Sequence, residues 1–440
     1  MRAMCADGIS FGCAVGLGLA ISTGYPAGLA VAIAMPVACL IPRSRKSAFR
    51  NALGYYSAGL WPMIPGAQRY LAHSSSTSTA ILIWLCSSML LALPWTLAWT
   101  ASSRVGYLWR VPLANLAYVL PPLAIIGFIT PITGAGYLFP GAGWLGLAAA
   151  AFLPGFILSL LNPTSGASRA SQSPAVAAVI ALGLATQVLA PAHMPPPAGW
   201  EAIDTNFGDL SQPAQEFRGM EAIQQRVATS SARVLIFPES VVPRWSEASA
   251  EFWRQTLIEC RARGQVLAIG AGLPSSNSAD GRATEARVGQ YDVASAIETL
   301  RAGARHFPPR QSTSRAADDD AQTDSYENTL LFLGAQSSAF HQRVPVPGGM
   351  WHPLGRGGVP VHLNGPAVME LGHERLAVVI CYEQILVFPI LASMLQRPSV
   401  LVGISNMYWF SGTTIPRYQE SAIRAWAKLF DVPYLTATNF

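Results

Sequence analysis

Apolar and polar positions divide the chain into two unlike halves. Up to about residue 191 it consists of long uncharged apolar stretches separated by short polar segments. The apolar stretches cover residues 8–22, 26–41, 51–67, 79–99, 111–130, 143–161 and 174–191. Several reach the roughly 17–25 residues with which an α-helix crosses a bilayer. The pattern predicts a membrane α-helical bundle of about seven spans, of which the first three are the weakest because they are short or interrupted by Gly and Pro.

The second half alternates short apolar runs with amphipathic stretches, after a Pro-rich linker at 191–198. Strands are predicted at 233–237, 266–270, 329–333, 361–363, 375–380, 400–404 and 433–437, and helices at 211–230, 246–263 and 417–429. Residues 273–325 are rich in Ser, Ala, Arg and Asp, and predict a surface insertion with a helix near 292–304. This alternation is typical of an α/β domain, here over 195–440, following a transmembrane domain over 1–194.

Charge separates the two halves as clearly as hydropathy does. Charged residues are only 12% of the chain and the mean hydropathy is +0.32. Within residues 1–200 the only acid is Asp7, against nine bases, so the net charge of +5 belongs to the first half. Bases gathered in membrane loops, rather than on a soluble face, argue against direct contact with nucleic acid.

The bases also predict an orientation. If all seven stretches span, the loops on one side, at 42–50, 101–110 and 162–173, hold most of the bases, and the opposite loops hold only Arg69. Basic loops stay in the cytoplasm, so an odd number of spans places the second half in the periplasm. Were 51–67 merely interfacial, the count would be even and this pattern would fail. A transporter is disfavoured because no acid or His lies within a predicted span after Asp7.

Two apolar runs in the second half each end in a reactive side chain. Residues 377–380 lead directly to Cys381, Tyr382 and Glu383. A thiol at a strand-to-helix corner can project into a cleft, where nearby charge can favour the thiolate. The commonest role of a free cysteine, however, is apolar packing in a core. Cys381 is thus either a nucleophile or a core residue.

Two further charged side chains are candidates for the same chemistry. Glu239 follows the apolar run 234–238, and is either a general base or a charge favoured at a helix N-terminus. Arg343 follows a predicted strand, and is either an oxyanion-stabilising cation or a solvated loop residue. The seven histidines show no metal-binding spacing, and no nucleotide-binding motif is present, so no metal or cofactor is predicted.

Taken together, these segments resemble the nitrilase (carbon–nitrogen hydrolase) superfamily, in its membrane-embedded apolipoprotein N-acyltransferase branch. Residues 235–240 resemble the strand that ends in the general-base Glu, and residues 379–383 resemble the nucleophile segment. Further segments agree in order, at 326–332, 403–410 and 424–439. The resemblance covers about 230–272 and 326–440, and the apolar first half agrees with it. It implies a nitrilase-type αββα sandwich after the membrane bundle.

The resemblance also implies roles for particular residues. Glu239 would be the general base and Cys381 the nucleophile, with Glu383, Tyr382 and Asn406 in supporting positions. In this branch the acyl donor is a membrane lipid and the acceptor a lipoprotein amine. The implied partners are therefore a membrane lipid and a lipoprotein or another envelope amine.

This chain departs from the family pattern in two places. Strict register puts Gln342 where the family has a catalytic Lys, and Met350 at a second Glu. The only cationic candidates nearby are Arg343 and His341; Arg343 can hold an oxyanion, but an arginine cannot readily shuttle a proton. Family members also continue beyond the Ala-Thr-Asn strand, whereas this chain stops at Phe440.

The segment from Arg343 to Pro353 resembles a group of plasmid conjugal transfer proteins with the same layout. We therefore expect a multi-pass protein of the bacterial inner membrane that works with other conjugation proteins. Two functions are compatible with the sequence. One is Cys-dependent acyl transfer or amide hydrolysis, and the other is a catalytically degenerate membrane component of the conjugation apparatus.

Overall fold

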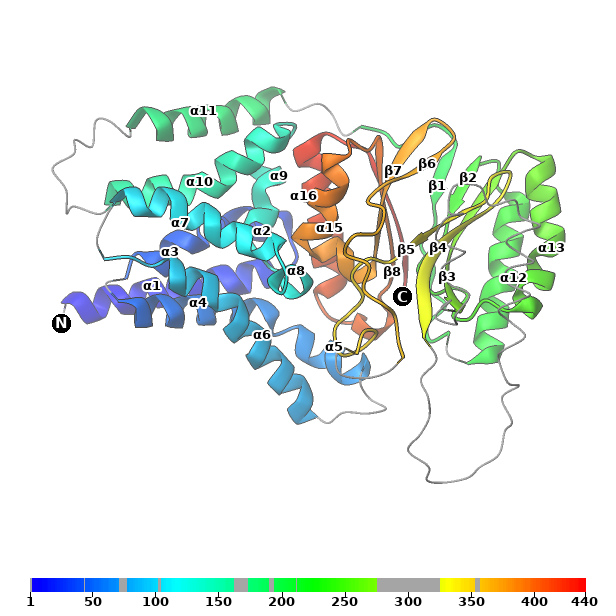
Figure 1. Cartoon of the computed structure of the whole chain (residues 1–440), viewed down its shortest axis with the longest axis horizontal. Helices are drawn as coiled ribbons and strands as arrows, with labels where there is room; N and C mark the ends of the chain where they lie inside the picture. Colours follow the sequence, from blue (N-terminus) through cyan, green and yellow to red (C-terminus); the bar gives the residue numbers. More distant parts are fainter. Residues whose placement is uncertain are drawn as a thin grey trace. The chain divides into compact units, whose positions relative to one another are not determined.

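The computed structural model describes residues 2–42, 44–70, 77–101, 104–161, 173–189, 194–210, 212–274, 325–352 and 357–440. The chain forms two compact units (Figure 1). The helical unit comprises Met1–Pro195, Gln384–Leu401 and Trp409–Tyr434, and the sheet unit comprises Pro196–Glu383, Val402–Tyr408 and Leu435–Phe440. The chain thus leaves the sheet unit twice near its end and returns each time.

The helical unit is built from helices of very different length. Its helices are α1 (Arg2–Ser22), α2 (Pro26–Ala32), α3 (Met35–Leu40), α4 (Arg45–Leu60), α5 (Met63–Tyr70), α6 (Thr77–Ala98), α7 (Arg104–Leu116), α8 (Leu123–Ile126), α9 (Ala135–Leu138), α10 (Gly143–Leu161), α11 (Ser173–Leu189), α15 (Val387–Leu395) and α16 (Ile415–Phe430). Three of the predicted apolar stretches are each divided, and the first of these is 26–41, which forms α2 and α3. The 51–67 stretch breaks between α4 and α5 at Pro62, and the 111–130 stretch breaks after α7, before Pro121 and Pro122. Proline lacks an N–H and fixes φ, which interrupts helical hydrogen bonding.

Two helices of the described residues, α6 and α10, are long and apolar enough to cross a membrane. Both present large apolar side chains outward, including Leu97, which is 68% exposed, and Leu145, which is 73% exposed. Shorter apolar helical segments cover 7–22, 26–40 and 180–189. The expected bundle of about seven spans therefore stays a prediction, for which α6 and α10 are the strongest members.

Hydrogen bonds between buried aromatic side chains join helices inside this unit. The Tyr56 hydroxyl donates to the Tyr118 hydroxyl (2.8 Å) and accepts from Trp95 Nε1 (3.0 Å). Hydrogen bonds of this kind hold helices together where no water competes. The late helix α16 belongs to the same unit, because the hydroxyl of its Tyr418 accepts from the Ile129 N–H (3.1 Å).

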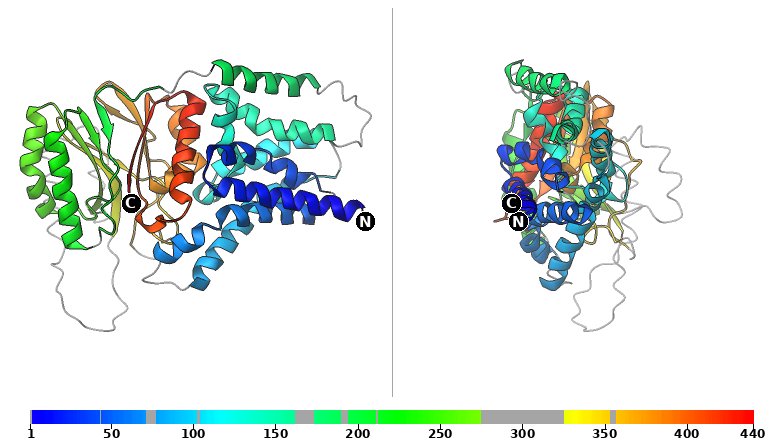
Figure 2. Two further views of the ribbon diagram at one scale, coloured as in Figure 1. Left: turned by 180° about the vertical axis from the view of Figure 1, so that it is seen from behind. Right: turned by 90° about the vertical axis from the view of Figure 1, so that its left-hand side faces the viewer.

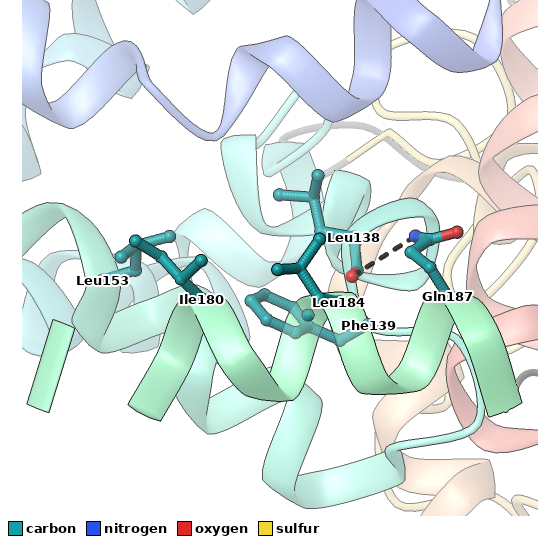
Figure 3. Close-up of a pocket in the computed structure, with 7 residues that line it drawn as sticks. Leu138, Phe139, Leu153, Ile180, Leu184 and Gln187 are labelled. Carbon is teal, nitrogen blue, oxygen red and sulfur yellow. Dashed lines mark hydrogen bonds between the residues drawn. The ribbon is translucent and has the colours of Figure 1, made fainter. Parts of the chain in front are cut away.

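Helix α11 packs on the unit across an apolar groove of about 260 Å³. The groove is lined by Leu138, Phe139, Leu153, Ile180, Gly183, Leu184 and Gln187 (Figure 3). Gln187 supplies the polar contact, since its Nε2 donates to the carbonyl oxygen of Tyr137 (2.6 Å). Apolar contact and one amide thus fix α11 beside α9.

The sheet unit contains two β-sheets. The five-stranded sheet has the order β1 (Trp200–Ala202), β2 (Val234–Ile236), β3 (Val266–Pro274), β4 (Tyr326–Gly334) and β5 (Ser338–His341). Its first three strands are parallel, and β4 and β5 are antiparallel to their neighbours. The second sheet has the order β6 (Met369–Leu371), β7 (Glu374–Ile380), β8 (Val400–Asn406) and β9 (Tyr434–Asn439). At one end, the Thr205 N–H donates to the Thr438 carbonyl (2.9 Å), next to a bridge between Thr205 and Asn439.

Helices α12 (Pro213–Thr229) and α13 (Glu247–Ala262) cover one face of the five-stranded sheet (Figure 2). Ile223 of α12 and Trp253 of α13 pack with Leu235, Leu267 and Leu331 from three strands in one buried core. α13 begins with a capping box, in which Ser246 and Ser249 each accept from the other's backbone N–H. This core holds in place the strands whose ends carry the site described below.

Most of the predicted elements in this half are confirmed. The predicted helices correspond to α12, α13 and α16, and six of the predicted strands correspond to β2, β3, β4, β7, β8 and β9. The strand predicted at 361–363 is wrong: the segment is a loop, held by the His362 N–H donating to the Arg343 carbonyl (2.9 Å). The short strands β1, β5 and β6 and the helix α15 were not predicted. The helix expected at 292–304, and nearly all of the 273–325 insertion, lie outside the described residues.

Candidate active site

Glu239 lies just beyond β2, in a turn that the neighbouring strand holds tightly. It is only 3% exposed. The turn needs a left-handed residue, Ser240 (φ +56°), and hydrogen-bonds to β3 through the Gly270 N–H and the Pro238 carbonyl (3.1 Å). A Cβ atom on Gly270 would collide with the Cα of Glu239. Gly270 is therefore what lets β3 pass close enough to fix the carboxylate.

Cys381 directly follows β7 and begins a short 3₁₀ turn, Cys381–Ile385. Its φ of +52° is a left-handed conformation that a non-glycine residue adopts at some cost, and such strain is typical of functional sites. The residue is free and half-buried. Its thiol donates a hydrogen bond to the Glu239 carboxylate. The structure thus brings together the two residues, 142 positions apart, that the sequence singled out.

Two further neutral groups donate to the Glu239 carboxylate. Asn328 of β4 donates its side-chain N–H to Oε1 (2.6 Å), and the backbone N–H of Asn406, at the end of β8, donates to Oε2 (2.8 Å). Asn328 is buried and also donates to Gln342 Oε1 (2.9 Å). Gln342 in turn donates to the carbonyl oxygen of Ile380 (3.0 Å), the residue that precedes Cys381. A chain of hydrogen bonds therefore runs from Glu239 to β7, the strand that Cys381 follows.

Glu383 is fully buried and ties the nucleophile turn to the segment after β5. Its Oε1 accepts from the backbone N–H groups of Arg343 (2.6 Å) and Val344 (3.0 Å), and its Oε2 accepts from the Ile380 N–H (2.9 Å). A carboxylate with this many donors can stay ionised in a dry environment. Glu383 thus sets the relative position of Gln342 and Cys381 through backbone contacts.

Arg343 is 1% exposed and pairs with this same carboxylate. Its Nε lies 3.5 Å from Glu383 Oε1, its NH2 group donates to the Val378 carbonyl (3.2 Å), and its guanidinium lies over the ring of Phe340 (5.6 Å). These contacts neutralise Glu383. The oxyanion role assigned to Arg343 from the sequence stays a prediction, and its contacts favour a role in positioning the turn.

Burial displaces the pKa of both central groups in the same direction. The pKa of Glu239 is raised by burial, although its hydrogen bonds from Cys381, Asn328 and Asn406 oppose the shift. The pKa of the Cys381 thiol is raised well above its usual value by burial and by the adjacent Glu239 carboxylate, and the backbone N–H groups of Asn406 and Tyr382 partly oppose this. The Cys381 sulfur therefore rests as a thiol at neutral pH, hydrogen-bonded to Glu239.

The remaining predicted residues lie at different distances from this pair. Asn406 joins it through its backbone, while its side-chain oxygen accepts from Asn439 Nδ2 (3.2 Å). The backbone of Tyr382 reaches the Cys381 sulfur, and burial raises the pKa of its phenol. His341 instead contacts Thr329 Oγ1 through Nδ1 (2.9 Å), and burial lowers its pKa. Met350 is buried.

Asn328 and Gln342 are the residues that sequence reasoning did not assign to the site. Asn328 is one of three consecutive polar residues near the start of β4, ahead of the apolar run 330–333, so the sequence did not single it out. Gln342 had been noted only as the residue standing in place of a Lys. Among the described residues, no group of three or more His, Cys, Asp or Glu side chains can hold a metal ion.

The site brings together Glu239 and Cys381, two residues to which the resemblance assigns roles, at strand ends of two β-sheets, with Gln342 in place of the family Lys. Solved structures of the amidase from Nesterenkonia sp. AN1, of the nitrilase superfamily, include a cysteine-to-alanine mutant that aligns with 55% of this chain and 74% of its own, at 12% identity and a TM-score of 0.33. Another mutant of that amidase, with a covalent acetamide adduct at its active-site cysteine, aligns over the same shares at 11% identity and the same TM-score. No family model matches the chain.

Two curated proteins are similar in sequence to nearly the whole chain. The chain is 28% identical to the probable conjugal transfer protein TraB of Sinorhizobium fredii over 428 residues, which is 95% of this chain and 94% of that one. It is also 28% identical to the conjugal transfer protein TraB of Agrobacterium fabrum, over 96% and 91% of the two chains. The chain is therefore similar to these two conjugal transfer proteins along nearly its whole length.

Proposed function

We propose that this protein acts in plasmid conjugal transfer as a membrane-embedded acyltransferase or amidase that works through Cys381. The observation that carries the proposal is the hydrogen bond from the Cys381 thiol to the buried Glu239 carboxylate. A nucleophile in contact with its base, next to backbone donors, is the arrangement that covalent acyl transfer needs. The TraB relationship supports the setting in conjugation.

In the proposed reaction, Glu239 removes the thiol proton as the sulfur attacks an ester or amide carbonyl. The C–S bond forms and the carbonyl electron pair moves onto oxygen, giving a tetrahedral oxyanion. The pair then returns, the C–O or C–N bond to the leaving group breaks, and Glu239 gives its proton to the departing alcohol or amine. An amine or water next attacks the thioester, which releases the acyl group and restores the thiol. A membrane lipid as donor and an envelope amine as acceptor fit a membrane-embedded enzyme.

Mass spectrometry of the full-length protein tests the reaction class. After incubation with p-nitrophenyl butyrate or with membrane lipid, we expect one acyl group on Cys381. The Cys381→Ala variant should gain none. Cys260→Ala is the matched control, because Cys260 is a buried core cysteine of α13, and this variant should still gain the acyl group. A wild-type protein that stays unacylated with both donors contradicts the proposal.

The second candidate function is a non-catalytic component of the conjugation apparatus. It is favoured by the neutral surroundings of Glu239 and by the raised pKa of the Cys381 thiol, which keeps the sulfur protonated at neutral pH. Plasmid transfer frequency in cells that carry Cys381→Ala separates the two. The enzyme proposal requires a large loss of transfer that Cys260→Ala does not cause, whereas unchanged transfer favours the non-catalytic role.

A further inference from the structure

Gln342 is a fully buried side chain at the centre of the site's hydrogen-bond chain. It is 0% exposed. Its oxygen accepts from Asn328 Nδ2 (2.9 Å) and its Nε2 donates to the Ile380 carbonyl (3.0 Å). Its backbone N–H donates to the Asn328 carbonyl (2.8 Å), so the residue is fixed at both ends. A carboxamide held in this way has one orientation, with its nitrogen next to the nucleophile's strand.

One of the two hydrogens on Gln342 Nε2 is available for a further hydrogen bond. A carboxamide NH₂ carries two donors, and among the residues the structure describes Gln342 Nε2 has a single acceptor, the Ile380 carbonyl. Leaving a fully buried N–H without an acceptor is costly, and proteins seldom tolerate it without a reason. That nitrogen is held on the carbonyl of Ile380, the residue that immediately precedes Cys381.

Arg343, the charged side chain that could stabilise an oxyanion instead, already has other partners. Arg343, the adjacent residue, contacts Glu383, the Val378 carbonyl and the Phe340 ring. The Glu383 carboxylate also accepts from the Arg343 and Val344 N–H groups, which fixes the backbone on one side of Gln342. The guanidinium thus serves to hold the segment that presents the carboxamide.

We propose that the side chain of Gln342 is the oxyanion donor of this site, giving a neutral hydrogen bond to the acyl carbonyl oxygen during attack by Cys381. This inference rests on the proposed function. As the C–S bond forms, the carbonyl electron pair moves onto the oxygen, which accepts a hydrogen bond from the second Nε2–H of Gln342. As the leaving group departs, the electron pair returns and the C=O bond is restored. The backbone N–H of Tyr382, which already reaches the sulfur, is placed to act beside it.

Two reactions of the Cys381 thiol can distinguish an oxyanion donor at Gln342 from a residue that only positions its neighbours. Acylation by p-nitrophenyl butyrate passes through an oxyanion, whereas alkylation by iodoacetamide displaces iodide without one. In the full-length protein in detergent, Gln342→Met should slow the burst of p-nitrophenolate by about 100-fold, the effect of losing one oxyanion donor. Its alkylation rate should match that of the wild type. Gln336→Met, the same change at an exposed glutamine beyond β4, should alter neither rate.

A second variant restores a donor at the same place. Gln342→Lys keeps an N–H group within reach, so it should acylate faster than Gln342→Met. The donor role is overturned if Gln342→Met acylates at the wild-type rate, or if acylation and alkylation fall together, since Gln342 would then act only through Asn328 and Glu239. If the wild-type protein itself is not acylated, the proposed function is overturned as well. This outcome is recognisable because the wild type and every variant then react with iodoacetamide but not with the ester.

Discussion

At the residue scale, the main feature of the site is a buried carboxylate whose hydrogen-bond donors are all neutral. Cys381, Asn328 and the Asn406 backbone supply the three donors to Glu239. Burying a charge without an opposite charge costs folding free energy that hydrogen bonds only partly offset. We therefore expect Glu239 to lower the stability of the fold at neutral pH.

Glu239→Gln should remove the pH dependence of stability that this carboxylate causes, while abolishing acylation. Because burial raises the folded pKa of Glu239 above its ordinary value of 4.5, the native state binds a proton more readily than the unfolded state. Stability from this group is fully present below pH 4.5 and falls as pH rises through the folded pKa. The amide removes that loss, which is about 1.4 kcal/mol for each unit of pKa displacement.

Thermal unfolding of both proteins from about pH 4 to pH 8, a range that brackets the ordinary carboxyl pKa, checks this expectation. The melting temperature of Glu239→Gln, measured relative to that of the unsubstituted protein, should be highest at neutral pH and should fall towards the acidic end. An advantage that grows as the solution becomes more acidic would contradict it.

The sequence could identify Glu239 and Cys381 because each follows an apolar strand that ends in a reactive side chain. It could not identify the roles of Asn328 and Gln342. Those depend on register, since Asn328 lies opposite Gly272 in the β3–β4 pair and Gln342 falls just past β5. Nor could it show that Arg343 is engaged by Glu383, because that pair forms only when separate segments meet.

At the scale of elements, the site depends on how closely β3 passes the turn after β2. Gly270 donates to the Pro238 carbonyl and accepts from the Val242 N–H (both 3.1 Å). Any side chain at position 270 would clash with the backbone of Glu239. The spacing of two neighbouring strands thus determines where the base lies.

Gly270→Ala should therefore damage both stability and chemistry. The added methyl group forces the Pro238–Ser240 turn away from β3, at a cost of about 1–3 kcal/mol for overpacking. Acylation of Cys381 should fall with it, because Glu239 moves with the turn. Gly12→Ala is a suitable control, since a methyl group at that position of α1 meets nothing within 4 Å. Denaturation and the ester assay measure the two effects, and a Gly270→Ala protein as stable and active as the control would contradict the argument.

Elements were predictable where periodicity was strong. The apolar run of β7 and the amphipathic repeat of α16 gave correct positions. The prediction at 361–363 failed because three residues are too few to distinguish a strand from a loop held by local hydrogen bonds. The divided apolar stretches failed for another reason. Apolar length predicts burial in lipid or protein, but it does not show where a helix stops, and prolines do not settle this because Pro94, Pro112 and Pro154 lie inside α6, α7 and α10.

At the scale of the whole molecule, the unequal distribution of charge sets the expected orientation. Bases cluster at Arg43, Arg45, Lys46 and Arg50, close to the N-terminus of α4, and after Asp7 the next acid along the chain is Glu201. Basic loops are retained in the cytoplasm. The sheet unit then faces the periplasm if the spans are odd in number.

Fusions to alkaline phosphatase, which is active only in the periplasm, test that orientation. A fusion after Pro195 should be active, and a fusion within the basic loop near Ser44 should be inactive. Equal levels of both fusion proteins must be verified by immunoblot. An inactive Pro195 fusion that fluoresces when green fluorescent protein replaces the phosphatase would place the sheet unit in the cytoplasm and make the span count even.

Helix α16 follows most of the sheet unit in the sequence, yet it packs inside the helical unit. Tyr418 bonds to Ile129, Tyr137 bonds to the Ser421 carbonyl, and a methyl group on Gly136 would strike the Ala425 backbone. The gene is therefore not a simple join of an anchor and a detachable enzyme. Recombination at the codon for Pro195 would strip α16 of the partners that bury it, so we expect the two halves to have been inherited and to have diverged as one piece.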